Sequence, residues 1–249
     1  MKIEILGCSG SVMPGYGTTS ILVDSKVLID AGSVMSVLDP HSVTGIRAVL
    51  ITNPHIDHIM EPPFLVDALY MKRARGIRIL GSPQTIDAIR AHVFNGLIWP
   101  DLAELDTTAD FVTLESISGE AVHIDGIDIT AFPVEHTRGA YGYVLSSDGG
   151  HVLFSGDTGY HEGLFALIKR LSPTLRACFI EASFPDRMEN LARITQHLTP
   201  GLISRGLDGI VRPQTRVFVY HIKPAHIEEV MADLPAGFEC ARAGEVILL

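Results

Sequence analysis

The feature that most constrains this chain is the segment Thr52-Asn53-Pro54-His55-Ile56-Asp57-His58, in which three metal-binding side chains fall within four residues. The segment follows an apolar run, 48–51, that is typical of a buried strand. Side chains this close in sequence cannot all point to one side of a strand. On a loop that leaves a strand end they can converge on one point, and a divalent metal ion is the usual reason. A single loop histidine is commonly structural, so the prediction rests on the whole cluster.

Length and composition narrow the classes of protein that remain. The chain has 249 residues, of which 47% are apolar and 19% charged, so it can bury a sizeable core. No linker rich in Pro, Gly or Ser divides it, and we expect a single domain over residues 1–249. The net charge of -10 argues against a protein built to hold long nucleic acid, which normally has a basic face. It does not exclude a small anionic substrate held by metal.

Several patterns bear on cellular location. Cys8, Cys178 and Cys240 follow no CxxC pattern, and we expect reduced thiols in a cytoplasmic protein. The N-terminus begins directly with an alternating strand and shows no secretory signal. No apolar run approaches the roughly 20 residues needed to span a membrane, so we expect no membrane partner. Formation of a homo-oligomer is left open.

The order of expected elements predicts an α/β fold. Three hairpins are expected, pairing residues 19–23 with 27–29, 121–124 with 127–132, and 141–146 with 151–154. Expected helices span residues 34–38, 64–72, 83–94, 162–171, 190–197, 200–207 and 227–234. The less regular stretch 99–114 is a candidate cap over the site. Hairpins followed by β-α alternation in each half suit a four-layer sandwich, with two sheets face to face and helices outside.

Further metal-binding side chains follow other expected strands. They are His136, Asp157 in a Gly-Asp-Thr-Gly turn, and His221. Imidazole and carboxylate together suit zinc, manganese or iron, and no thiolate lies near these motifs. Asp30, which closes the first hairpin, fits either an outer partner of a ligating histidine or a plain turn residue. The residues therefore predict one or two divalent metal ions, with zinc first and manganese or iron as alternatives.

The same set of residues resembles the metallo-β-lactamase superfamily, whose pattern is HxHxDH, then a His, a GDT-type Asp and a final His. The resemblance runs from Leu6-Gly7 to His221, nearly the whole chain. Three further stretches resemble the class II 3′,5′-cyclic-nucleotide phosphodiesterases, namely Ile180-Glu181-Ala182-Ser183-Phe184, Gln196-His197-Leu198-Thr199-Pro200 and His221-Ile222-Lys223-Pro224. This resemblance implies a four-layer αββα sandwich of the metallo-β-lactamase type.

The resemblance also implies roles for individual residues. One metal site would hold Asn53, His55 and His136, a second would hold Asp57, His58 and His221, and Asp157 would bridge the two. The implied reaction is hydrolysis of a 3′,5′-cyclic nucleotide to the 5′-nucleotide through a metal-activated hydroxide. Asp57 would also orient the nucleophile. His197 would donate a proton to the departing 3′-oxygen or hydrogen-bond the phosphate, although a surface histidine near a helix end is the structural alternative. Lys223 and Arg138 are weaker candidates for pairing with phosphate.

One position departs from the family pattern. Asn53 stands where the pattern has a histidine, and an amide oxygen is a much weaker zinc ligand than imidazole. Three outcomes follow: the first site is weak or empty, it holds an oxygen-preferring ion such as Mn²⁺, or Asn53 binds no metal and hydrogen-bonds the nucleophile or substrate.

Other functions stay open at this point. Within the same superfamily they are an RNA-processing nuclease, which the acidic balance disfavours, and a lactonase or thioesterase, since an activated water also attacks carbonyl carbon. From a different class, the chain could be a weakly active metal- or nucleotide-binding protein whose site is compromised at Asn53.

Overall fold

The strands form two sheets in the computed structural model, which describes residues 1–105 and 111–249. Within these residues each sheet has seven strands. The first sheet has the order β14 (Val246–Leu248), β1 (Lys2–Gly7), β2 (Ser20–Val23), β3 (Val27–Ile29), β4 (Ala48–Leu50), β5 (Ile77–Gly81) and β6 (Val112–Ser116). The second has the order β13 (Phe238–Cys240), β12 (Arg216–Tyr220), β11 (Leu175–Glu181), β10 (Gly150–Phe154), β9 (Tyr141–Ser147), β8 (Ile127–Pro133) and β7 (Val122–Ile124).

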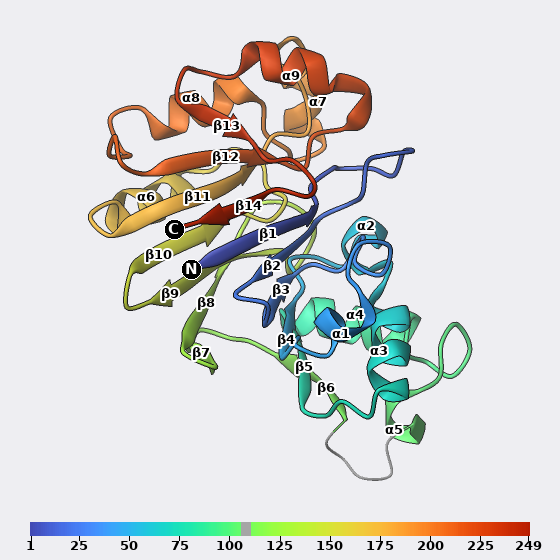
Figure 1. Ribbon diagram of the computed structural model, residues 1–249. Helices are drawn as coiled ribbons and strands as arrows, with labels where there is room; N and C mark the ends of the chain where they lie inside the picture. Colours follow the sequence, from blue (N-terminus) through green and yellow to red (C-terminus); the bar gives the residue numbers. More distant parts are fainter. Residues whose placement is uncertain (106–110) are drawn as a thin grey trace.

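Helices cover the outer face of each sheet (Figure 1). The first sheet carries α1 (Pro40–Val43), α3 (Pro62–Met71) and α4 (Pro83–His92), whose apolar residues pack in one buried cluster with the outward side chains of β3 to β5. The second sheet carries α6 (Glu162–Leu171), α8 (Pro200–Leu207) and α9 (Ile227–Asp233) in a separate cluster. The shorter elements are α2 (Ile56–Ile59), α5 (Leu102–Leu105), α7 (Glu189–Ile194) and 3₁₀ turns at Asp186–Met188 and Pro224–His226.

A third apolar cluster lies between the two sheets and joins them. It contains the inward side chains of both, including Ile3 and Leu50 from the first sheet. On the second sheet Phe154, Phe179 and Phe218 stack across three adjacent strands with ring centroids 4.8 and 4.7 Å apart. Helix, sheet, sheet and helix therefore form four layers, and the expected αββα sandwich is confirmed. Among the described residues, no helix is both long and apolar enough to cross a bilayer.

Local turn chemistry explains why the hairpins form where the sequence predicts them. The β7–β8 hairpin turns at Asp125-Gly126, and both residues have positive φ, 46° and 92°. This is the backbone of a two-residue hairpin turn that matches the right-handed twist of the strands. The β2–β3 and β9–β10 hairpins also pair as expected.

Two expectations about local structure are wrong, and one strand was missed. Residues 34–38 form turns, and the helix begins later, at Pro40. The Asp39 side chain caps this helix by accepting hydrogen bonds from the backbone N–H groups of His41 and Ser42, and proline suits the first helical position. The short edge strand β13 was not expected. In the stretch 99–114, Trp99 packs against Phe64 of α3 and residues 112–116 form β6, so these parts do not cap the site; residues 106–110 lie outside the described residues.

One hydroxyl links the two sheets beside the segment that follows β4. Tyr143 on β9 is fully buried, and its Oη donates a 2.7 Å hydrogen bond to the backbone oxygen of Ile51. The next residue, Thr52, accepts from the backbone N–H of Tyr141 at 2.8 Å. Together these bonds fix the start of the histidine-rich segment against the second sheet.

We predict that Tyr143→Phe lowers the free energy of unfolding by about 1–2 kcal/mol, because a buried carbonyl loses its partner. Urea denaturation measures the change. Tyr70→Phe, which removes a hydroxyl from a half-exposed side chain, should change the free energy by less than about 0.5 kcal/mol. Equal effects of the two substitutions would contradict the assigned role of the Tyr143 hydroxyl.

Candidate metal centre

The segment after β4 is arranged by its own side chains. Asn53 is buried, and its Oδ1 accepts a 2.9 Å hydrogen bond from the backbone N–H of His55, which turns the chain. His55 then caps α2, a single helical turn that carries Asp57 and His58. The expectation of a plain loop is corrected here, since a helical turn places these two side chains. The convergence inferred for the loop is still found.

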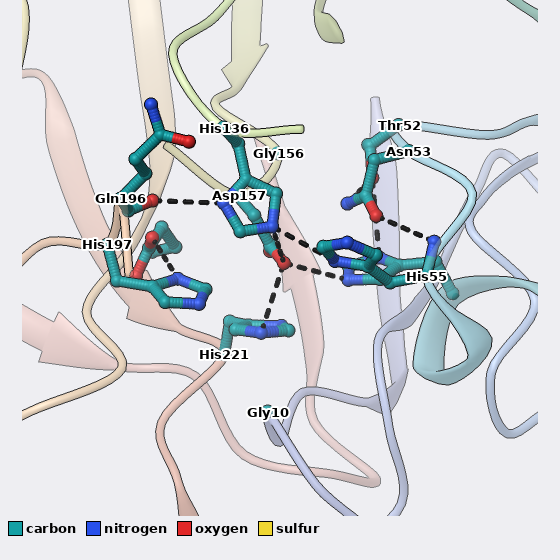
Figure 2. Close-up of polar contacts among 12 residues, drawn as sticks. Gly10, Thr52, Asn53, His55, His136, Gly156, Asp157, Gln196, His197 and His221 are labelled. Atoms are coloured by element: carbon teal, nitrogen blue, oxygen red, sulfur yellow. Dashed lines mark hydrogen bonds and ion pairs between the residues drawn. The ribbon is translucent and has the colours of Figure 1, made fainter. Parts of the chain in front are cut away.

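Asp157, which follows β10, lies at the centre of the cluster (Figure 2). Its carboxylate is almost fully buried, and three imidazoles surround it. The Nε2 atoms of His58, His221 and His136 lie 3.0, 3.3 and 3.7 Å from Asp157 Oδ2. Asp57 approaches from the more open side, with Oδ2 3.8 Å from the Nε2 atoms of both His58 and His221.

The expected ligands fall into two groups that could each hold a metal ion. One group is His55, His136 and Asp157, and the other is Asp57, His58 and His221, with the ligand atoms of each group all within 4.8 Å of one another. A third set, Asp157, His197 and His221, meets the same distance, although His197 was not an expected ligand. This grouping is the one that the family resemblance implies, apart from Asn53, and Asp157 lies next to both groups. Six of the seven expected positions thus come together from four separate parts of the chain, whereas the Asn53 side chain bonds to the backbone N–H of His55.

The donor set fits a divalent cation. Two ligands each about 2.1 Å from a tetrahedral ion lie roughly 3.4 Å apart, and the observed separations around Asp157 Oδ2 are 3.0 to 3.7 Å. Four buried side-chain atoms have no hydrogen-bond partner among the described residues, namely Asp157 Oδ1, His221 Nε2, His161 Nε2 and Tyr220 Oη, and the first two lie in this cluster. Buried polar atoms are rarely left unpaired.

Outer partners orient the imidazoles. His58 Nδ1 lies 2.7 Å from the buried carboxylate of Asp30, which also accepts from the N–H and hydroxyl of Thr52 at 2.8 Å. His221 Nδ1 lies 3.1 Å from the hydroxyl of Thr19. Of the two roles open to Asp30, the structure supports the outer partner, which commonly fixes the orientation of a ligating histidine. Thr19 was not expected, and no spacing in the sequence marks it.

Burial and neighbouring charges set the protonation of the cluster. Burial lowers the pKa of His55 and His221, and takes that of His136 to about 4, which favours neutral, metal-binding imidazoles. Burial also acts to lower the pKa of His58, but the carboxylates of Asp157 and Asp30 outweigh it and raise that pKa well above its usual range. The raised pKa of His58 thus reflects its position between two buried acids.

His197 is brought to the same cluster by a buried acid that the sequence reasoning did not single out. His197 Nδ1 lies 2.7 Å from Glu181 Oε1 and 3.1 Å from the hydroxyl of Ser183. Its ring stacks beside that of His221 at 5.7 Å. Burial acts to lower the pKa of His197, but the Glu181 carboxylate outweighs it and raises that pKa. The available signal was Glu181 itself, an acid directly after the apolar run 177–180.

The backbone is held in unusual conformations at two of these positions. His221 and Asp30 have φ of 59° and 56°, in the left-handed region that residues other than glycine seldom adopt. The backbone N–H of His221 donates a 2.7 Å hydrogen bond to the backbone oxygen of Cys8. Gly10 packs so closely against His221 that a Cβ at position 10 would lie 2.6 Å from the His221 backbone oxygen. The loop after β1 thus forms one wall of the cluster and needs glycine at position 10.

Comparison with known proteins agrees with this fold. The family model described as "Beta-lactamase superfamily domain" matches residues 25–234. The chain belongs to the beta-lactamase superfamily. Solved structures of this superfamily's metallo-β-lactamase fold align over nearly the whole chain: YhfI from Bacillus subtilis has a TM-score of 0.78 at 16% identity, with 99% of each chain covered.

A yeast cyclic-nucleotide phosphodiesterase and a human tRNase Z also resemble the chain. The 3′,5′-cyclic-nucleotide phosphodiesterase 1 of Saccharomyces cerevisiae is 36% identical over 97 residues, which are 38% of this chain and 26% of the yeast protein. The structure of unliganded yeast PDE1 aligns at a TM-score of 0.79 with 20% identity, covering 100% of this chain and 99% of that one. The structure of human tRNase Z, short form, aligns at a TM-score of 0.73 with 15% identity, covering 100% of this chain and 99% of that one. The superfamily fold and the His/Asp cluster are those of a metal-dependent hydrolase.

We predict that Asp30→Asn weakens zinc binding by about 10–100-fold, because an amide nitrogen cannot accept the proton of His58 Nδ1. Competition with a chromophoric chelator measures the affinity. Asp39→Asn is the matched control, since Asn caps α1 as well as Asp does and Asp39 is exposed. Wild-type affinity in the Asp30 variant would contradict the outer-partner role.

We also predict unequal metal sites. The second group offers three ligands of its own, Asp57, His58 and His221. The first group offers only His55 and His136 besides the shared Asp157, because the Asn53 oxygen already accepts a hydrogen bond from the His55 backbone N–H. Elemental analysis after extensive dialysis should find about one equivalent of metal retained. Two equivalents retained with equal affinity would refute this asymmetry.

Proposed function

We propose that this protein is a metal-dependent phosphodiesterase that hydrolyses 3′,5′-cyclic nucleotides to 5′-nucleotides. The observation that carries the proposal is His197, held by Glu181 beside the Asp157 cluster. A hydrolase that cleaves a phosphodiester needs a proton donor near the leaving oxygen. The 36% identity with the yeast cyclic-nucleotide phosphodiesterase over 97 residues supports the same substrate class.

The ligand assignments belong to this proposal. We assign His55, His136 and Asp157 to one site, with Asn53 at its edge, and Asp57, His58, His221 and Asp157 to the other. Zinc is the first choice of ion, because imidazole and carboxylate are its usual ligands together, and manganese or iron would fit as well. Divalent ions bound here would lower the pKa of the attacking water and neutralise charge on the phosphoryl oxygens.

The protein's own side chains supply positioning and proton transfer. The side chain of Asp57 is 21% exposed and faces His58 and His221, so its carboxylate can accept a hydrogen bond from the attacking water and orient it. Because Nδ1 of His197 is occupied by Glu181, the proton for the leaving 3′-oxygen comes from Nε2. The raised pKa of His197 keeps that proton available near neutral pH.

The test is turnover of three substrates by zinc- or manganese-loaded protein: cyclic AMP, bis(p-nitrophenyl) phosphate and a lactone. We expect cleavage of cyclic AMP to 5′-AMP and of the diester. Turnover of the lactone alone would refute the proposal, and no turnover with either metal would favour a binding protein.

We predict that His197→Gln lowers kcat for cyclic AMP by about 10²–10⁴-fold, the usual contribution of a general acid, with unchanged metal content. His92→Gln is the control, since His92 is an exposed residue at the end of α4. A His197 variant that loses metal in proportion to activity would instead assign His197 to metal binding.

A further inference from the structure

Lys223 is held rigidly two residues after the cluster residue His221. Its backbone N–H donates to the backbone oxygen of Ser183 at 3.2 Å, and Pro224 follows it directly. Ser183 in turn contacts His197. The backbone of Lys223 is therefore tied, through Ser183, to the two histidines on this side of the cluster.

The ammonium group of Lys223 reaches back across the cluster's wall. Lys223 Nζ donates to the backbone oxygen of Gly10. Gly10 lies against the His221 ring, since a Cβ built on it would be 3.0 Å from His221 Nε2, and Figure 2 places it beside that residue. The positive charge thus lies at the histidine cluster.

This half-buried cation lacks an acidic partner. Within the described residues no carboxylate oxygen lies within 4.0 Å of Lys223 Nζ, whereas Lys2 and Lys26 pair with Glu4 and Asp125. An ammonium has three N–H donors, and Gly10 takes one. Two donors are left for another acceptor. The chain has a net charge of -10, so a local positive charge at the cluster would favour the binding of an anionic substrate.

We propose that Lys223 binds the anionic phosphoryl oxygens of the substrate and makes the site selective for phosphoesters over neutral carbonyl esters. This inference rests on the proposed function and names a specificity residue for it. Lys223 touches the phosphoryl group and takes no part in proton transfer, which belongs to His197. The charge-assisted hydrogen bond holds the substrate, so its loss raises KM more than it lowers kcat.

The test compares zinc-loaded wild-type protein with Lys223→Gln, Lys223→Arg and Lys169→Gln. Glutamine keeps a donor for Gly10 but removes the charge, and arginine keeps both. Lys169 is an exposed residue of α6, so its substitution removes the same charge away from the cluster. Calorimetry measures the binding of inorganic phosphate, and kinetics compare bis(p-nitrophenyl) phosphate with the neutral ester p-nitrophenyl acetate. Elemental analysis and thermal unfolding verify that zinc content and folding are unchanged.

We expect Lys223→Gln to weaken phosphate binding and to raise KM for the diester about tenfold, with KM for the neutral ester unchanged. Lys223→Arg should retain most of the affinity, and Lys169→Gln should behave as wild type. Phosphate binding by Lys223→Gln equal to wild type, equal losses in the two glutamine variants, or no phosphate binding by wild type would each overturn the assignment. If the wild-type protein hydrolyses cyclic AMP and the Lys223→Gln variant has the same phosphate binding and KM, only the role of Lys223 is overturned. Phosphate binding that depends on Lys223, without phosphodiester turnover, would overturn the proposed function alone.

Discussion

The interaction on which the structure depends is the buried contact of His58 with two carboxylates. Its ring lies between Asp30 at 2.7 Å and Asp157 at 3.0 Å, and all three side chains are almost completely buried. Burying two acids around one imidazole is costly unless positive charge compensates them. A proton on His58 supplies part of that charge, and a divalent cation at the cluster would supply more while displacing the proton. The arrangement therefore makes chemical sense as a metal centre.

The sandwich brings these groups together because its strands end at a common edge. Asp30 follows β3, Asp157 follows β10 and His221 follows β12, and β3 and β4 are parallel neighbours in one sheet as β10, β11 and β12 are in the other. The apolar core between the sheets fixes their separation. Side chains on the strand ends therefore meet without a flexible loop between them and the core. This rigidity allows His221 and Asp30 to be kept at positive φ.

The sequence predicted the layers, most of the hairpins and the groups that meet at Asp157, because each depends on a local pattern: apolar runs, Asp-Gly turns, and acids or histidines at strand ends. It could not predict partners that are distant in sequence and chemically ordinary. Thr19 meets His221 across 202 residues, and Tyr143 meets Ile51 across 92. The helix expected at residues 34–38 failed because capping by Asp39 decided where the helix begins. Asn53 was recognised as the departure from the pattern, but its hydrogen bond to the His55 N–H became visible only in the fold.

Anomalous X-ray scattering at the zinc edge, from crystals grown with zinc, tests whether the Asp157 cluster is a metal centre. We expect the strongest peak about 2.0–2.2 Å from Asp157 and from the Nε2 atoms of His58 and His221, with a weaker peak between His55 and His136. No peak at Asp157, or a zinc ion bound only at surface histidines such as His41 or His123, would contradict the account.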